Sequence, residues 1–294
     1  AKSAFQVDFS VLFQNTDFCD RMRELLQVLE TAYEHPVDVE FTVNCIVSDE
    51  GTLKDYRINL VQCRPFQVNL MGSGSLGILP SNISKEHLFL RSDGPIVGRS
   101  VAAPIARLVY VSSRAYTTLN EQDKYALARL IGQVSHPRES RPSGSPSASV
   151  HPEGIVMLVG PGRWGTSTPS MGVPVSFNDI KDVKVLVELA LMHEGLVPDV
   201  SLGTHFFNDL VEMDMLYCAV FPERKDCLFN EAFLSYASTY LHLVPPVNEL
   251  WASALTVLES TEQAELRLYA DATAQHAVCY LVTQSPEQAL PRQP

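Results

Sequence analysis

The stretch between residues 37 and 65 most constrains what this chain can fold into, because apolar and polar residues alternate along it with the period of a β-strand. In Val37–Ser48 the polar residues Asp38, Glu40, Thr42 and Asn44 alternate with apolar residues. Asp49–Thr52 contains a glycine and is typical of a turn. Together with the apolar-rich segment Tyr56–Phe66, this pattern predicts a β-hairpin.

The polar side chains of this hairpin favour a metal–nucleotide site. Simple alternation places Ile58, Leu60, Gln62 and Arg64 on one face of the return strand, where Glu40 of the first strand can join them. A carboxylate suits Mg²⁺, and a planar guanidinium binds phosphate oxygens through two hydrogen bonds. The alternative interpretation is a solvated strand face with one Glu–Arg cross-strand pair, which contributes only ~0.2–1 kcal/mol.

The residues VEFTV (39–43) and LVQCRP (60–65) also carry a family resemblance. They resemble the end of the ATP-grasp nucleotide-binding domain of the phosphoenolpyruvate synthase and pyruvate phosphate dikinase family, in which an (I/V)EF/W strand precedes an LQ-x-R-P strand. The resemblance implies that Glu40 binds the metal and that Gln62 and Arg64 face the phosphates of ATP. It also implies Mg²⁺ and ATP as cofactors, and a small phosphorylated or carboxylate substrate. The connection between the two strands is longer here than the short hairpin usual in the family.

Other parts of that family are not recognisable in the sequence. Only about 36 residues precede the hairpin, whereas the family's domain begins with a long portion that carries a Lys, Arg residues and a glycine-rich loop. Neither the swivelling domain, with its phosphorylated His in a Thr-x-His setting, nor the pyruvate-binding barrel is recognisable. We therefore expect the chain to be the C-terminal part of a longer protein, whose missing N-terminal part completes the nucleotide site, and we expect the fragment alone to be inactive.

Composition and charge exclude some partners. With a net charge of −12, the chain is not expected to bind nucleic acid or an anionic membrane, which both attract basic surfaces. No apolar run approaches the ~18 residues of a membrane span, and the start AKSAFQVDFSVLF lacks the basic region of a signal peptide. The six cysteines show no C-x-x-C spacing, which favours reduced thiols and a cytoplasmic location.

The segments around the hairpin suggest two domains. Ala4–Phe13 has the pattern of a short strand, and Asp17–Glu34 that of an amphipathic helix. Residues 69–80, NLMGSGSLGILP, are rich in glycine and serine and are typical of a linker. We therefore place a boundary near residue 75. The predicted class is α+β (mixed α/β), with an ATP-grasp-like fragment in residues 1–75 and a mixed-sheet α/β domain in residues 76–294.

The second domain is expected to alternate strands and helices around a mobile loop. Residues 135–153 are dominated by Ser, Pro and charged residues and cannot bury enough apolar surface to order themselves. Apolar runs predict strands and amphipathic stretches predict helices. The strands are Leu88–Leu90, Ile96–Val97, Ile105–Val111, Val183–Leu191, Met215–Phe221, Leu250–Leu258, Ala264–Tyr269 and Ala277–Val282, and the helices are Glu121–Gln133, Phe177–Lys181 and Asn230–Tyr240.

A second stretch of chemical interest follows the apolar run that starts at Ile155. The motif GPGRWG (160–165) matches G-x-G-x-x-G, but Thr166–Pro174 contains two prolines and cannot continue as the helix that a dinucleotide fold requires. Two interpretations remain open: an anion-binding nest of backbone N–H groups, or a tight loop whose glycines permit unusual φ values while Trp164 packs on the core. The residues available to a nest are Gly160, Gly162, Arg163, Gly165 and Thr166.

This stretch resembles a second region. GPGRWGTS-x-P-S-x-GVPV, followed by DVKVLVE and GTHFFNDLVE, resembles an uncharacterised C-terminal region attached to some bacterial phosphoenolpyruvate synthase-like proteins. The resemblance implies no activity. Within it, His205 is a weak candidate for a general base or a phosphate ligand near a helix start, the alternative being a hydrogen-bonded core histidine. Glu188 ends an apolar strand and needs a partner, for which Arg163 is the candidate.

Two functions from different classes therefore remain. The first is part of an ATP-dependent phosphotransferase resembling phosphoenolpyruvate synthase, in which Glu40, Gln62 and Arg64 supply contacts to Mg²⁺ and to the nucleotide phosphates. The second is a non-catalytic module that binds a phosphorylated ligand or a partner domain for regulation.

Overall fold

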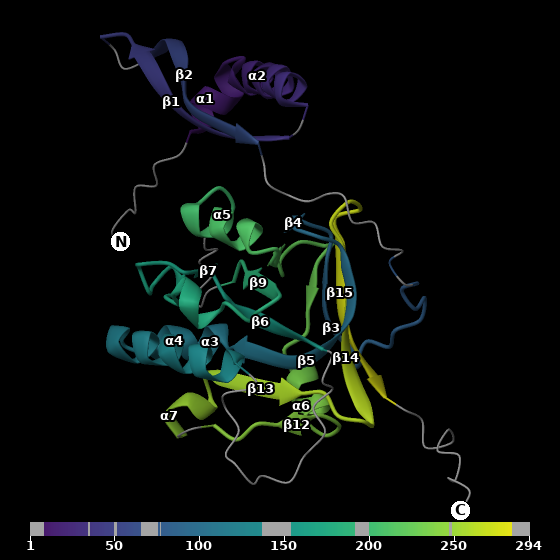
Figure 1. Cartoon of the computed structure of the whole chain (residues 1–294). Coiled ribbons are helices and arrows are strands. Elements are labelled where there is room, and N and C mark those ends of the chain that lie inside the picture. Colours follow the sequence, from purple (N-terminus) through teal and green to yellow (C-terminus); the bar gives the residue numbers. More distant parts are fainter. Residues whose placement is uncertain are drawn as a thin grey trace, which may run out of the picture. The chain divides into compact units, whose positions relative to one another are not determined.

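A computed structural model of the chain describes residues 9–34, 36–49, 52–65, 76, 78–136, 154–191, 200–246 and 249–283. The chain forms two compact units, unit 1 (Ala1–Gln67) and unit 2 (Val68–Pro294). The boundary expected near residue 75 thus falls eight residues after the last residue of unit 1. Helices and mixed strands give the protein a mixed α+β architecture (Figure 1).

In its described residues, unit 1 consists of two helices and the predicted hairpin. The helices are α1 (Ser10–Asn15) and α2 (Phe18–Tyr33), and the strands are β1 (Val37–Val47) and β2 (Leu53–Pro65). Phe18 packs its ring against Phe41 and Tyr56, with centroids 6.1 and 5.9 Å away, so the helices cover the apolar face of the hairpin (Figure 1). The strand expected over Ala4–Phe13 is wrong where the chain is described, because α1 begins at Ser10.

A β-bulge changes the predicted faces of the return strand. β1 and β2 are antiparallel, with Glu40 opposite Gln62 and Phe41 opposite Leu60, so Val61 is an extra residue. Because each residue added to a strand turns the following side chains to the other face, Gln62 leaves the face of Leu60. The prediction that Ile58, Leu60, Gln62 and Arg64 share a face is therefore wrong. The bulge places Gln62 and Arg64 on the polar face with Glu40.

Unit 2 is built on an eleven-stranded mixed sheet and a separate two-stranded one. The order of the main sheet is β11-β3-β15-β14-β5-β6-β9-β10-β4, with β13 and β12 attached at β5. The strands are β3 (Leu88–Ser92), β4 (Ile96–Val97), β5 (Val101–Val111), β6 (Ile155–Pro161), β9 (Val185–Leu189), β10 (Leu216–Val220), β11 (Leu228–Phe229), β12 (His242–Leu243), β13 (Leu255–Glu259), β14 (Ala264–Asp271) and β15 (His276–Thr283). The small sheet pairs β7 (Arg163–Trp164) with β8 (Gly172–Val173).

The four central strands β5, β6, β9 and β10 run parallel. Strands of parallel sheets are buried on both faces, which explains why β6, β9 and β10 are nearly continuous apolar runs. The sheet also curls until β10 reaches the end of β3. There the Ser92 hydroxyl donates to the Ala219 carbonyl (3.0 Å), and the Ala219 N–H donates to the Pro95 carbonyl (3.0 Å).

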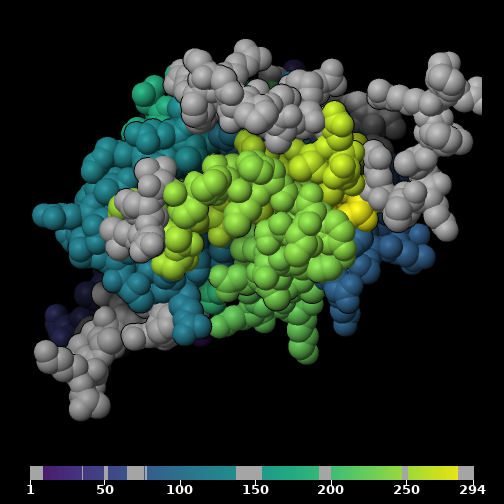
Figure 2. Space-filling model, turned by 90° about the horizontal axis from the view of Figure 1, so that it is seen from below, coloured from purple at the N-terminus to yellow at the C-terminus, as the bar shows by residue number. Residues whose placement is uncertain are grey.

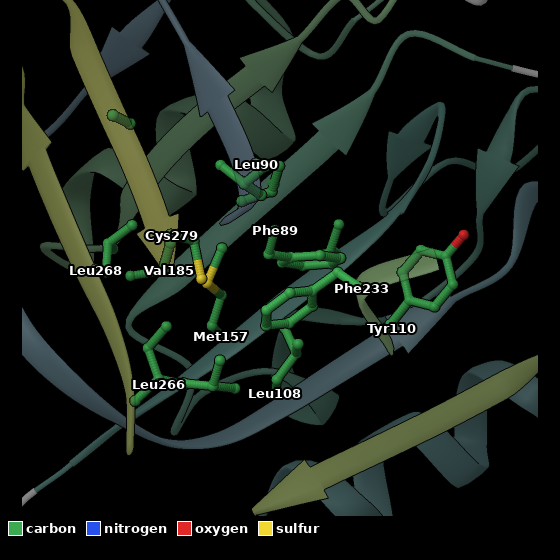
Figure 3. Close-up of a cluster of buried hydrophobic side chains, with 14 of the residues drawn as sticks. Phe89, Leu90, Leu108, Tyr110, Met157, Val185, Phe233, Leu266, Leu268 and Cys279 are labelled. Carbon is green, nitrogen blue, oxygen red and sulfur yellow. The ribbon is translucent and has the colours of Figure 1, made fainter. Parts of the chain in front are cut away.

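The concave side of the curled sheet holds the main hydrophobic core. Its members come from strands far apart in the sequence, and Figure 3 shows Leu108, Met157, Val185, Leu266 and Cys279 gathered with a group of aromatic rings. In this group Phe89 packs in a tilted arrangement against Phe233 of helix α6 (Ala232–Ala237), with ring centroids 5.2 Å apart, and it meets Tyr110 edge to face at 6.3 Å.

The remaining helices connect the strands. They are α3 (Ser113–Thr118), α4 (Glu121–Ser135), the 3₁₀ helix η1 (Phe177–Asp179), α5 (His205–Glu212) and α7 (Glu249–Ala252). The strand expected over Leu250–Leu258 is wrong in its first half, because Leu250 to Ala252 belong to α7 and β13 begins at Leu255. In Figure 2 the yellow-green surface of the chain around α6 to β13 lies beside the teal surface of the β5–α4 segment, in agreement with the pairing of β13 and β5.

Most of the loop expected over residues 135–153 lies outside the described residues, while Ser135 is the last residue of α4. Among the described helices none is long and apolar enough to cross a membrane.

Candidate functional site

The open face of the hairpin gathers the polar side chains that the sequence singles out. Residues directly opposite each other in an antiparallel pair point to the same face. Glu40 faces Gln62, and the neighbouring pair on the same face is Asp38 with Arg64. The bulge at Val61 is what brings both pairs onto the face opposite the helices. We call Asp38, Glu40, Gln62 and Arg64 the polar cluster of unit 1.

Within the polar cluster, Arg64 already contacts a carboxylate. Its Nε donates to Asp38 Oδ2 at 3.2 Å, and the two side chains are 38% and 27% exposed. The Nη groups of Arg64 make no hydrogen bond to any residue that the structure describes. Asp38 was not predicted as a site residue, although its partner Arg64 was. The alternation of Asp38 and Glu40, two residues apart on one strand, was the signal that could have found it.

The donor set of the polar cluster fits a hard cation that is shared with a ligand. Mg²⁺ is commonly held by one or two carboxylates, with phosphates and water completing its octahedron. Asp38 and Glu40 offer two carboxylates and Gln62 an amide oxygen. No group of three or more His, Cys, Asp or Glu residues that could hold a metal ion occurs in the described ranges. A cation here would therefore take its other ligands from phosphate and water.

The GPGRWG loop has a different character, because its N–H groups are already used. Gly162, Arg163 and Gly165 donate to the carbonyls of Leu189 (2.9 Å), Met171 (3.0 Å) and Val173 (2.9 Å) respectively, and the Trp164 N–H donates to the Glu188 carboxylate (3.0 Å). None of these four N–H groups is left for an anion. The hydroxyl of Thr166 is also engaged, since it accepts from the Thr168 N–H at 3.1 Å. The nest of backbone amides, one of the two interpretations of this motif, is therefore not formed.

The glycines of this loop instead make room for close packing. A Cβ atom on Gly160 would lie 2.6 Å from the ring of Trp164, which is 1% exposed. Gly162 and Gly165 have positive φ angles of 61° and 70°, and a Cβ on Gly165 would lie 2.3 Å from the ring of Phe206. The tight-loop interpretation of the motif therefore fits the structure, with Trp164 as its anchor.

Glu188 is a buried carboxylate at the carboxyl end of β9, with no side-chain exposure. Its Oε1 accepts from the Trp164 N–H (3.0 Å) and the Ser201 hydroxyl (2.5 Å). Its Oε2 accepts from the Ser201 N–H (2.7 Å) and the Tyr217 hydroxyl (2.7 Å). Burial raises the pKa of Glu188, and these hydrogen bonds act in the opposite direction. The expected partner Arg163 is not among the four donors, so that prediction is wrong.

His205 is placed at the surface. It is the first residue of α5, whose N-cap Thr204 accepts from the Phe207 N–H at 3.2 Å. The imidazole is exposed and makes no hydrogen bond or ion pair with any residue in the described ranges. The alternative of a core histidine is therefore wrong.

One further hollow lies between α4, α7 and β13. It has a volume of about 20 Å³ and apolar walls that include Leu130, Trp251 and Val257. This is room for about one water molecule, which is too little for a substrate or a nucleotide. The polar cluster of unit 1 is therefore the best candidate site.

Comparisons with known proteins add no further constraint. Neither the scan against protein-family models nor the searches of curated proteins and of solved structures found a match.

Proposed function

We propose that this chain is part of an ATP-dependent phosphotransferase of the phosphoenolpyruvate synthase type, and that unit 1 belongs to an ATP-grasp-like nucleotide-binding domain. The observation that carries this proposal is the register of the hairpin, which holds Glu40, Gln62 and Arg64 in two adjacent cross-strand pairs on one polar face. The cofactors are Mg²⁺ and ATP, and the substrate is a small phosphorylated or carboxylate molecule.

Each member of the polar cluster has a definite role in this proposal. The carboxylate of Glu40 binds Mg²⁺, which also binds the phosphates. The guanidinium of Arg64 donates its Nη groups to phosphate oxygens, and Gln62 lies between the two and contacts the same phosphates. Phosphoryl transfer requires little covalent chemistry from a protein. These residues therefore act by positioning the nucleotide and by neutralising its charge.

The GPGRWG loop is left out of the proposed nucleotide site. Its backbone amides donate to protein acceptors, so they cannot cradle a phosphate without breaking the hydrogen bonds that hold Trp164 and Glu188 in place.

Calorimetric titration of the whole 294-residue chain with Mg·ATP tests the proposal. Arg64→Ala should weaken binding by about 10- to 100-fold, because hydrogen bonds to charged groups contribute roughly 1.5–3 kcal/mol. Arg57→Ala is the matched control, since Arg57 lies on the same face opposite Asn44, away from the cluster. Equal losses in both variants would refute the assignment, as would the absence of binding to the unmodified chain.

The same titration distinguishes the proposed nucleotide site from the alternative function, a non-catalytic regulatory module. A regulatory module for phosphorylated ligands would bind phosphoenolpyruvate or inorganic phosphate through Arg64 and would not need Mg²⁺ or the nucleotide. Parallel titrations with these two ligands therefore distinguish a nucleotide site from a general phosphate site.

A further inference from the structure

The ion pair between Asp38 and Arg64 has a consequence for how the proposed site accepts its ligand. The two side chains lie in a directly opposed cross-strand pair, joined by one hydrogen bond of 3.2 Å through Arg64 Nε. Both side chains remain partly exposed, so solvent screens the ion pair and it is weak. A weak pair of this kind can be exchanged for a stronger contact at little cost.

The charges of the polar cluster decide what can take part in this exchange. Asp38 and Glu40 carry two negative charges, Arg64 carries one positive charge, and Gln62 is neutral, so the cluster has a local charge of −1. A triphosphate without a cation meets two carboxylates and an arginine that one of them already holds. Repulsion between the phosphates and the two carboxylates therefore disfavours binding of the metal-free triphosphate.

A divalent cation reverses this balance. When it binds Asp38 and Glu40 together with the phosphates, it neutralises the carboxylates and frees the Nε side of Arg64. The guanidinium can then bind a phosphate oxygen through Nε and Nη at once, in the two-bond geometry that arginine favours.

We infer that Asp38 is the residue that makes nucleotide binding depend on the divalent cation: it holds Arg64 in the empty site and exchanges it for the metal when the Mg·nucleotide complex binds. This inference rests on the proposed function. Asp38 would then determine specificity, because it favours the metal-bound triphosphate over the free anion. Through Asp38, binding of the cation and binding of the nucleotide would each strengthen the other.

The test is to measure ATP affinity by calorimetry for the whole chain, once with excess Mg²⁺ and once with EDTA, and to compare the ratio of the two dissociation constants. In Asp38→Asn the metal-free affinity should rise and the Mg·ATP affinity should stay equal or fall. The ratio should therefore shrink by about tenfold, within the range usual for coupled sites.

Asp55→Asn is the matched control. Asp55 faces Ile46 on the same side of the hairpin, so this variant removes the same charge from the same face. It lies roughly 26 Å along the strand from Asp38 at ~3.3 Å per residue, beyond the ~8–10 Å over which salt leaves surface charges coupled. Its ratio should equal that of the unmodified chain.

The outcomes separate the two proposals. If the unmodified chain binds Mg·ATP but Asp38→Asn changes both affinities by the same factor, or changes the ratio no more than Asp55→Asn, the role of Asp38 is refuted while the nucleotide site stands. If the unmodified chain binds ATP under neither condition, both proposals are overturned.

Discussion

Replacing Glu188 with glutamine perturbs the most buried charge that the structure describes at the ends of the parallel strands. Each carboxylate oxygen accepts one backbone N–H and one hydroxyl, from Trp164 and Ser201 at one oxygen and from Ser201 and Tyr217 at the other. The two hydroxyls can rotate, whereas the two N–H groups cannot. Whichever way the glutamine amide turns, its NH₂ group therefore faces a fixed N–H donor.

The expected loss of stability follows from this one unpaired N–H group. One buried N–H without an acceptor destabilises a protein by about 1–3 kcal/mol, and this is the loss we expect in the free energy of unfolding of Glu188→Gln. Glu188→Ala leaves both fixed donors unpaired and opens a cavity, so it should lose about 3–5 kcal/mol.

Urea denaturation followed by tryptophan fluorescence is the appropriate assay. The chain has two tryptophans, Trp164 and Trp251, and both belong to unit 2, so the signal reports the unfolding of that unit alone. Glu262→Gln is the control, because Glu262 is exposed just before β14 and should lose less than about 0.5 kcal/mol. A stability of Glu188→Gln equal to that of the control would refute the account of this cluster.

Two further predictions concern packing and titration in unit 2. Gly165→Ala should lower the free energy of unfolding by about 3 kcal/mol, because its Cβ would meet the ring of Phe206 at 2.3 Å with φ at +70°. Gly203→Ala should lower the free energy of unfolding by only about 1 kcal/mol through backbone strain, because Gly203 has φ +79° but no atom lies within 4 Å of its Cβ position. Equal losses in the two variants would contradict the packing argument. Burial lowers the pKa of Lys124 below its ordinary value of 10.5. The unfolded chain therefore binds the ammonium proton of Lys124 more tightly than the folded chain does. The free energy of unfolding of the unmodified chain, relative to that of Lys124→Met, should therefore rise as pH increases from the lowered pKa to 10.5. Urea denaturation at a series of pH values measures this difference. A difference that falls or stays flat with pH would contradict the prediction.

The sequence was sufficient for the elements whose pattern is local. Alternation along residues 37–65 predicted the hairpin, and the apolar runs at Ile96–Val97 and Ile155 predicted β4 and β6. The predicted helix over Glu121–Gln133 appears as α4, with Asn120 accepting from the Asp123 N–H as its N-cap.

What the sequence could not give depends on contacts between distant segments. The bulge at Val61 is set by pairing with β1, and the sequence shows it only as two consecutive apolar residues, Leu60 and Val61. Gln62 and Arg64 were therefore wrongly grouped with Ile58 and Leu60, whereas their shared face with Glu40 is confirmed. Glu188 finds its donors in three separate segments after β6, before α5 and in β10, which no spacing rule connects. Arginine was the expected partner because a buried carboxylate needs compensation, and four neutral donors supply it instead.

The most direct test of the proposed nucleotide site is the change in backbone amide NMR signals when Mg·ATP is added to the ¹⁵N-labelled whole chain. We predict that the shifts concentrate on residues 38–42 and 59–64, around the polar cluster of unit 1, and leave the GPGRWG loop unchanged. Shifts centred on residues 160–166 or on His205, or no shifts at saturating Mg·ATP, would contradict the account.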